Sequence, residues 1–141
     1  MKRTKKIWVC VILAVILLCI VCWFTNPLLR VKVFVFLNGE QLETALLNGS
    51  GVPNLVGIDT FNTWEGEHSM TEFILFSRGL VPGSIYYGCY YSYDDVPLAF
   101  QNMGAELVQN GHAYWEWQGD GDNRGATQRL SDHWYYFEAA F

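Results

Sequence analysis

Residues 7–24 read IWVCVILAVILLCIVCWF, eighteen consecutive apolar residues that follow the basic start MKRTKK. A helix rises about 1.5 Å per residue, so this run reaches about 27 Å, close to the roughly 30 Å of a bilayer's hydrocarbon core. Trp8 and Trp23 stand near its two ends, where indole rings prefer the headgroup level. The stretch predicts a single N-terminal transmembrane helix.

The charges on either side of this run predict its orientation. Residues 1–6 carry four basic side chains, against Arg30 and Lys32 on the other flank. Because the flank richer in Lys and Arg normally stays in the cytoplasm, we expect a single-pass signal-anchor in the cell membrane, with a cytoplasmic N-terminus and the C-terminal domain outside. A cleaved signal peptide shares the same basic and apolar order, but the run is long for one and no small-residue cleavage site follows it.

The rest of the chain is expected to be a short linker, 25–29, and one extracytoplasmic β-rich domain, 30–141. Residues 25–141 hold five basic and all fourteen acidic side chains, a net charge of −9 with histidine neutral. This charge argues against nucleic acid as a partner, because neutralisation of phosphates by Lys and Arg dominates that affinity. It also predicts repulsion from anionic headgroups, so that only the tether would hold the domain near the membrane.

The domain itself is expected to be small and mostly antiparallel β, a sandwich or barrel-like meander with one short helix. Residues 30–37 alternate with period two, which is typical of a strand, and Asn38 followed by Gln41 resembles a helix cap, which predicts a helix over 39–47. Further strands are expected over 55–63, 71–77, 85–93, 105–109, 112–118, 127–130 and 133–139. Asn110-Gly111 predicts a two-residue type I′ hairpin turn.

The cysteines limit how this domain can be stabilised. Only Cys89 lies beyond the apolar run, so a disulfide within the domain is impossible and packing must supply its stability. Cys89 is expected to be a small buried hydrophobe, with intermolecular pairing or a reactive thiol as alternatives.

One loop suggests a metal. Residues 119–125 read GDGDNRG, and their alternating carboxylates match the start of a calcium loop, with Asp120, Asp122 and the Asn123 carbonyl as ligands. Arg124 breaks the match, because it stands where an oxygen ligand is needed. A Gly/Asp-rich connection between strands explains the same residues. Calcium is the one cofactor that the sequence suggests.

Aromatic and acidic residues gather near the C-terminus. The candidate ligand-binding residues are Trp115, Trp117, Trp134, Tyr136 and Glu116. Flat rings can cover the apolar faces of sugars, and rings with carboxylates can hold a cationic peptide. On a strand, however, Trp115 and Trp117 share a face and Glu116 points away, so part of this set also suits a core.

These observations favour a membrane-anchored, non-catalytic binding or interaction module near the membrane surface, with a glycan, a cationic peptide or a membrane protein as its partner. The sequence shows no nucleophile motif and no histidine spacing typical of a metal site. Two alternatives stay open. One is a membrane-surface hydrolase or transferase with unplaced Asp, Glu and His groups, and the other is a structural subunit of a membrane complex that packs through Cys10 and Ala14.

Overall fold

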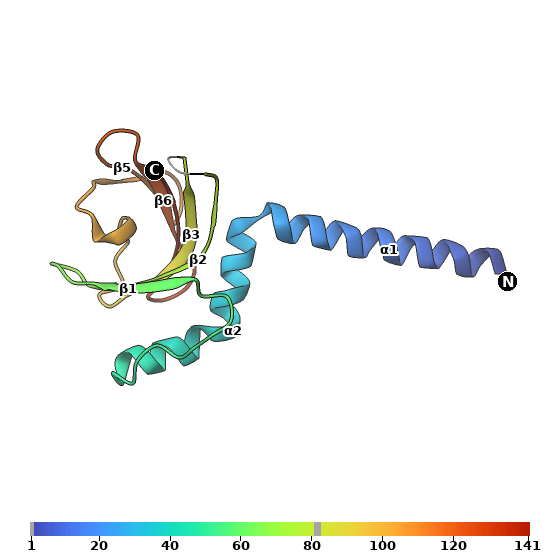
Figure 1. Cartoon of the computed structure of the whole chain (residues 1–141), viewed down its shortest axis with the longest axis horizontal. Coiled ribbons are helices and arrows are strands. Elements are labelled where there is room, and N and C mark those ends of the chain that lie inside the picture. Colours follow the sequence, from blue (N-terminus) through green and yellow to red (C-terminus); the bar gives the residue numbers. More distant parts are fainter. Residues whose placement is uncertain (1, 81–82) are drawn as a thin grey trace. The chain divides into compact units, whose positions relative to one another are not determined.

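The chain forms two units in the computed structural model, Met1–Arg30 and Val31–Phe141 (Figure 1). Helix α1 (Lys2–Thr25) and the start of α2 (Pro27–Leu47) belong to the first unit, and the rest of α2 and a β-sheet to the second. The structure describes residues 2–80 and 83–141, and for residues 2–7 and 9 it describes the backbone but not the side chains. The basic side chains of the expected flank 1–6 therefore lie outside the described part.

Helix α1 displays apolar side chains all round. Residues 10–24 are exposed, and Leu17 and Leu18 expose 62% and 63% of their surface. Among the described residues, however, no single helix is both long and apolar enough to cross a membrane. Within the described residues, the bent helix pair Cys10–Thr25 and Pro27–Leu47 is the one combination that reaches the length and hydropathy of a span. The expected fold with a single transmembrane helix is therefore contradicted.

The break between the two helices has a local cause. Pro27 has no N–H to continue the hydrogen bonds of α1, and its fixed φ suits the first turn of a new helix. Asn26 caps that helix, because the backbone N–H of Leu29 donates to Asn26 Oδ1 at 2.9 Å. In the structure, residues 25–29 are thus the end of α1, the cap and the first turn of α2.

Helix α2 replaces the strand expected over 30–37. Its buried residues recur with the period of a helix and are Val31, Phe34, Gly39, Leu42 and Ala45. Asn38 lies inside the helix, where its Nδ2 donates to the carbonyl of Phe34 at 2.9 Å, and is not the cap of a helix over 39–47. Both sequence predictions were wrong, because the helical period of the buried residues outweighs the alternation of the valines.

The second unit is built on one antiparallel sheet of seven strands. The strands are β1 (Thr60–Trp64), β2 (Met70–Arg78), β3 (Ile85–Ser92), β4 (Leu107–Gln109), β5 (Tyr114–Gln118), β6 (Arg124–Arg129) and β7 (Trp134–Ala140). Each overlaps a segment that the sequence predicts. Their order in the sheet is β1-β2-β3-β7-β6-β5-β4, so two meanders join where β3 pairs with β7. The fold is therefore one sheet and neither a continuous meander nor a two-sheet sandwich.

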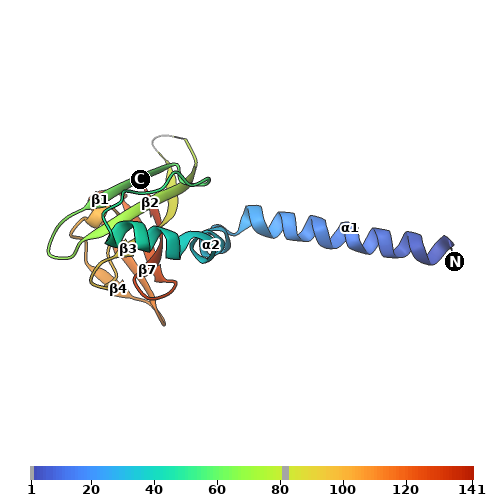
Figure 2. The same cartoon turned by 90° about the horizontal axis from the view of Figure 1, so that it is seen from below.

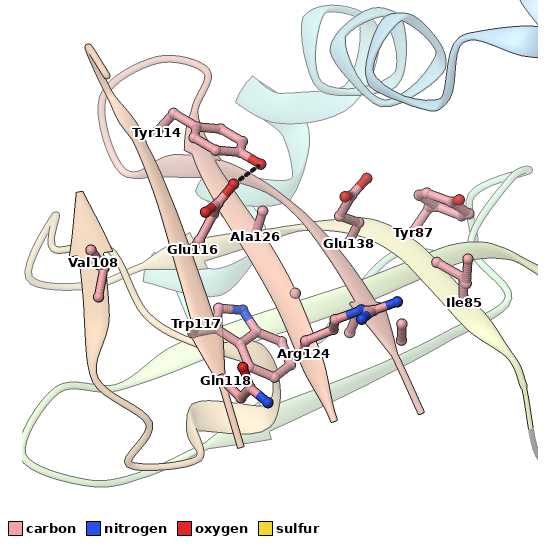
Figure 3. A pocket seen from close by; sticks show the side chains of 13 residues that line it. Ile85, Tyr87, Val108, Tyr114, Glu116, Trp117, Gln118, Arg124, Ala126 and Glu138 are labelled. Atoms are coloured by element: carbon pink, nitrogen blue, oxygen red, sulfur yellow. Dashed lines mark hydrogen bonds between the residues drawn. The ribbon is translucent and has the colours of Figure 1, made fainter. Parts of the chain in front are cut away.

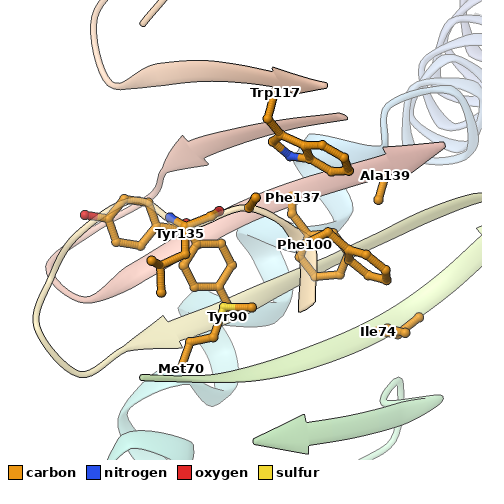
Figure 4. Packing of buried hydrophobic residues seen from close by; sticks show 10 residues of the cluster. Met70, Ile74, Tyr90, Phe100, Trp117, Tyr135, Phe137 and Ala139 are labelled. Carbon is orange, nitrogen blue, oxygen red and sulfur yellow. The ribbon is translucent and has the colours of Figure 1, made fainter. Parts of the chain in front are cut away.

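The sheet curves around residues 94–106, which include the 3-10 helix η1 (Phe100–Asn102) (Figure 1). The side chains on this core face form the main apolar cluster, shown in Figure 4. Tyr90 and Tyr135, direct partners across β3 and β7, stack with ring centroids 5.1 Å apart. The hydroxyl of Tyr90 also accepts the backbone N–H of Leu98 at 2.7 Å, which ties the 94–106 segment to the sheet.

Helix α2 packs against the opposite, outer face of the sheet. Figure 2 shows it lying across β3 and β7. Gly39 permits a close approach, because a Cβ there would already lie 3.6 Å from Trp134 Nε1. Tyr91 of β3 donates its hydroxyl to Glu43 Oε1 at 3.2 Å. These contacts cover the outer face at one end of β3 and β7.

The β4–β5 turn differs from the sequence prediction. The N–H of Asn110 donates to the carbonyl of Tyr114 at 3.0 Å, which leaves three residues, 111–113, in the loop. The left-handed conformation falls on Gly111 (φ 110°) and Ala113 (φ 59°). The two-residue Asn110-Gly111 turn was therefore wrong, because Asn110 still forms a backbone hydrogen bond across the hairpin to Tyr114.

Gly88 lies where β2, β3 and β7 meet. A Cβ at this position would collide with the backbone oxygen of Phe73 and lie 2.9 Å from two ring carbons of Phe137. Gly88→Ala should therefore lower the free energy of unfolding by about 2 kcal/mol or more, as overpacked sites do. Urea unfolding of the full chain measures this loss. Gly104→Ala is the control, since its Cβ would meet nothing within 4 Å, and equal stabilities of the two variants would contradict the packing.

Asp95 joins the turn after β3 to the β6–β7 loop. Its carboxylate accepts the backbone N–H of His133 at 2.8 Å and a guanidinium N–H of Arg129, and its carbonyl accepts the hydroxyl of Tyr135 at 2.9 Å. Burial alone would raise the pKa of Asp95, but the hydrogen bonds from His133 and Arg129 outweigh burial, and the pKa is lowered.

Asp95→Asn should lower the free energy of unfolding by about 1–3 kcal/mol at neutral pH. Because the pKa is lowered in the folded state, the stabilisation by the carboxylate is complete above its ordinary pKa of 3.8 and is lost as the pH falls through the folded value. Urea unfolding at about pH 7 and about pH 3 compares the full stabilisation with the reduced one. Asp94→Asn, whose partner His68 is exposed, serves as control. A loss of equal size at both pH values would argue against a role for the charge.

Candidate ligand-binding site

An open basin lies on the outer face of the sheet, over parts of β3, β5, β6 and β7 (Figure 3). Its volume is about 650 Å³. The polar side chains that line this outer-face basin are Tyr87, Tyr114, Glu116, Gln118, Arg124 and Glu138. Helix α2 covers the outer face beside Tyr91 and Trp134, and neither of these residues lines the basin.

The register of the strands creates the hollow. Glu116 pairs with Ala126, and Ala126 pairs with Glu138, so the three side chains form one row on the same face. Two strand spacings separate the glutamates, about 10 Å at the backbone. Because the residue between them is alanine, which is itself buried, the floor of the basin lies low between the two glutamates. Tyr87, the partner of Glu138 on β3, closes the row at one end.

The neighbouring row adds a second small residue and a cation. Arg124 pairs with Ala140 of β7 on one side and with Gln118 of β5 on the other. Ala140 leaves the floor of the basin low beside Ala126. The exposed guanidinium of Arg124 and the amide of Gln118 therefore stand at the rim, one row away from the carboxylates (Figure 3).

The carboxylates of Glu116 and Glu138 accept hydrogen bonds from neighbouring tyrosines and raise the pKa values of their hydroxyl groups. Tyr114 donates its hydroxyl to Glu116 Oε1 at 3.4 Å, and Tyr136 donates to Glu138 Oε2 at 3.0 Å. Burial first, and the charges of these glutamates second, raise the pKa values of Tyr87, Tyr114 and Tyr136. The three hydroxyl groups therefore stay protonated, and the negative charge in this part of the sheet is that of the carboxylates.

The basin offers hydrogen-bond acceptors and hydroxyl donors, and its polar lining contains no Ser, Cys, Lys or His that could act as a nucleophile. Cys89 is fully buried and unpaired, and burial raises the pKa of its thiol, so the expectation of a small buried residue is confirmed. Within residues 2–80 and 83–141, no group of three or more His, Cys, Asp or Glu side chains could hold a metal ion. What the basin can do chemically is bind a cation through carboxylates and aromatic rings.

The structure separates the aromatic residues that the sequence suggested as one binding surface. Trp115 and Trp117 lie on the core face of β5, and Trp117 is 3% exposed beneath Gly125. Trp134 is equally buried, on the outer face under α2. Glu116 lines the basin. Tyr136 does not line it, but its hydroxyl donates to Glu138, which does. The three tryptophans therefore form no common exposed platform.

The acidic loop between β5 and β6 contains the candidate calcium ligands. Asp120 and Asp122 are exposed, and neither has a resolved ion-pair partner among the described residues. The carbonyl of Asn123, the third expected ligand, accepts the N–H of Gly119 at 2.8 Å and closes the loop. Gly121 adopts a φ of 66°, as a tight turn between strands requires.

Sequence reasoning missed Tyr87, Arg124 and Glu138. Period-two alternation on each strand does show that Glu116 and Glu138 point away from their aromatic neighbours. What it does not show is that β5 and β7 lie two strands apart with Ala126 between them, because that depends on the register of three strands.

Comparison of the chain with protein-family models, with curated proteins and with solved structures finds no match in any of the three. The geometry and charge of the outer-face basin are therefore the basis for a functional assignment.

Proposed function

We infer that the protein is a membrane-attached, non-catalytic binding module whose outer-face basin holds a cationic group of its ligand, such as the Lys or Arg side chain of a peptide. The observation that carries this proposal is the row of Glu116, Ala126 and Glu138, in which two carboxylates flank a hollow. Each carboxylate already accepts a tyrosine hydroxyl, which orients it, and each keeps further lone pairs for a ligand.

The size and the surroundings of the basin support a cationic group. A volume of about 650 Å³ is that of a small-ligand pocket. The rings of Tyr87 and Tyr114 add faces to which a guanidinium or ammonium group is attracted. Residues 25–141 carry a net charge of −9, so a cation also approaches the domain along a favourable long-range field.

Attachment to a membrane is supported by the surface of α1. Its residues 10–24 contain no charged side chain and are exposed. Contiguous apolar surfaces of this extent are rare on proteins that are surrounded by water alone. Lipid contact removes this surface from water, at about 25 cal/mol per Å².

The ligand proposal predicts binding of a blocked tetra-arginine peptide to the full chain in neutral detergent micelles, measured by titration calorimetry at physiological salt. Glu116→Gln/Glu138→Gln should weaken binding about tenfold or more, because each exposed charge contact contributes up to about 1 kcal/mol and 1.4 kcal/mol is a factor of ten. Gln keeps the shape and the hydrogen-bond acceptor of Glu, so the fold is retained.

The matched control is Glu65→Gln/Glu67→Gln, which changes the net charge equally in the exposed β1–β2 loop. This control should leave the affinity within about twofold. If both double variants weaken binding equally, the peptide senses only the overall charge and the basin is not its site. Binding of a neutral tetrasaccharide without binding of the peptide would assign the module to glycans instead.

The membrane proposal predicts that the full chain floats with phosphatidylcholine vesicles in a density gradient. Leu17→Lys/Leu18→Lys should shift most of the protein to the soluble fraction, since each charge in an apolar helix costs about 2.5–3.5 kcal/mol in the membrane. Val56→Lys/Leu80→Lys adds the same charges at exposed apolar positions outside the helices and should float like the wild type. Flotation of the α1 variant would show that another surface makes the attachment.

A further inference from the structure

Glu72 occupies a core position of β2. Its neighbours along the strand on the same face are Met70 and Ile74, both part of the apolar cluster in Figure 4. Its direct partners across the sheet are Asn62 of β1 and Tyr90 of β3. The side chain is fully buried. An acidic side chain is almost never fully buried unless it is paired, and Glu72 has no cation as a partner among the described residues.

The hydrogen bonding of this carboxyl group is incomplete. Oε2 accepts the backbone N–H of Gln101 at 2.8 Å. Oε1 has no hydrogen bond of normal geometry within the described part of the chain. The indole N–H of Trp64, also without such a bond, lies close enough to lower the pKa of Glu72 but not close enough to satisfy Oε1. One accepted hydrogen bond does not replace the water that surrounds an ionised carboxylate.

The donor, Gln101, belongs to a strained segment. Gln101 and Asn102 of η1 have φ angles of 54° and 50°, in the left-handed region that a Cβ disfavours. Ring contacts of Phe100 with Tyr86, Phe137 and Phe141, together with two hydrogen bonds, hold η1 in place. Phe100 packs on Phe137 with centroids 5.2 Å apart, Asn102 Nδ2 donates to the carbonyl of His68 at 2.8 Å, and Gln101 donates to Glu72.

We propose that Glu72 is a proton-controlled latch for η1, which stays closed over the core face while the carboxyl group is neutral and opens when the carboxyl group ionises. A neutral carboxyl group with one accepted hydrogen bond costs far less to bury than an ionised one. An ionised one requires water at Oε1. Because β1 and β3 flank Glu72 on both sides within the sheet, displacement of η1 is the path by which water reaches it.

The charge state of Glu72 and the position of η1 are linked. Burial raises the pKa of Glu72 from its ordinary 4.5 to about 7, against the lowering effects of Gln101 and Trp64. When η1 opens, the carboxyl group meets water and recovers its ordinary pKa. The closed state therefore binds more protons than the open state, so opening increases from about pH 4.5 and levels off above about pH 7. The difference between the pKa values of the two states shifts the opening equilibrium by about 300-fold between low and high pH.

Few other groups share this titration. The charge of Glu72 reaches Tyr90 and Cys89 of β3 and raises their pKa values further, so both remain neutral at these pH values. No basic side chain shifts the pKa of Glu72 itself. His68 also contacts this segment: its ring faces Asp94 at 3.1 Å, and its carbonyl accepts a hydrogen bond from Asn102. A control must therefore separate His68 from Glu72.

Hydrogen exchange of the full chain in neutral detergent micelles tests the latch. After correction for the intrinsic exchange rate, the protection of residues 98–103 in the wild type should fall by up to about 300-fold between about pH 4.5 and about pH 8. Glu72→Gln mimics the neutral carboxyl group and should keep the high protection at every pH. His68→Asn should follow the wild type, and the paired amides of β3 and β7 should show no comparable change.

The proposal is overturned if Glu72→Gln and the wild type show parallel pH profiles, or if His68→Asn abolishes the pH dependence. Should Glu72→Gln fail to fold, Glu72→Met provides a second neutral side chain of similar length. A measurement on the wild type alone is also decisive. If the Glu72 carboxyl carbon titrates near its ordinary pKa by NMR, the closed state does not hold the proton and the latch does not exist.

Discussion

The pairing of β3 with β7 is the interaction on which the rest of the structure depends. It joins two meanders that are far apart in the chain, and it acts on both faces of the sheet at once. On the core face it stacks Tyr90 on Tyr135 and leaves room over Gly88 for Phe137. On the outer face the same register places Tyr87 beside Glu138 and so completes the basin. A shift by one residue would exchange the two faces and destroy the core and the basin together.

Local patterns predicted the strands well and the helical residues at the start of the second unit, 31–47, poorly. Each strand has alternating or aromatic residues and turn residues at its ends, and such signals act within a few residues. Residues 30–37 fit two periods, because Val31, Val33 and Val35 alternate while Val31 and Phe34 also share a helical face. Tertiary packing decides between them, since Val31, Phe34 and Leu42 are buried in the helix that the chain forms. The order of the strands had no local signal, because β3 and β7 meet only through tertiary contacts.

The candidate site was predicted only in part, and the reason is physical. Aromatic density drew attention to Trp115, Trp117 and Trp134, but large rings gain most free energy when they are buried, and the fold buries two of them almost completely. The basin is defined instead by small side chains, Ala126 and Ala140, between polar ones. A hollow of this kind is a property of three adjacent strands in register. Glu116 was identified because it is polar on an otherwise aromatic strand. The position of Glu138 opposite Glu116 could not be predicted, because it depends on the strand order of the sheet.

Glutamates on the two faces of the same sheet show how environment decides the role of a carboxyl group. Glu116 and Glu138 stand at an open surface, where water and tyrosine hydroxyls stabilise their charge and leave it available to a cation. Glu72 lies among apolar side chains with one hydrogen bond, so its charge is the unfavourable state. A carboxyl group between Met70 and Ile74 breaks the pattern of a core strand, and such a break lowers stability at neutral pH. A residue that costs stability in this way is expected where the protein needs two states, because an apolar side chain of the same size would hold η1 closed at every pH.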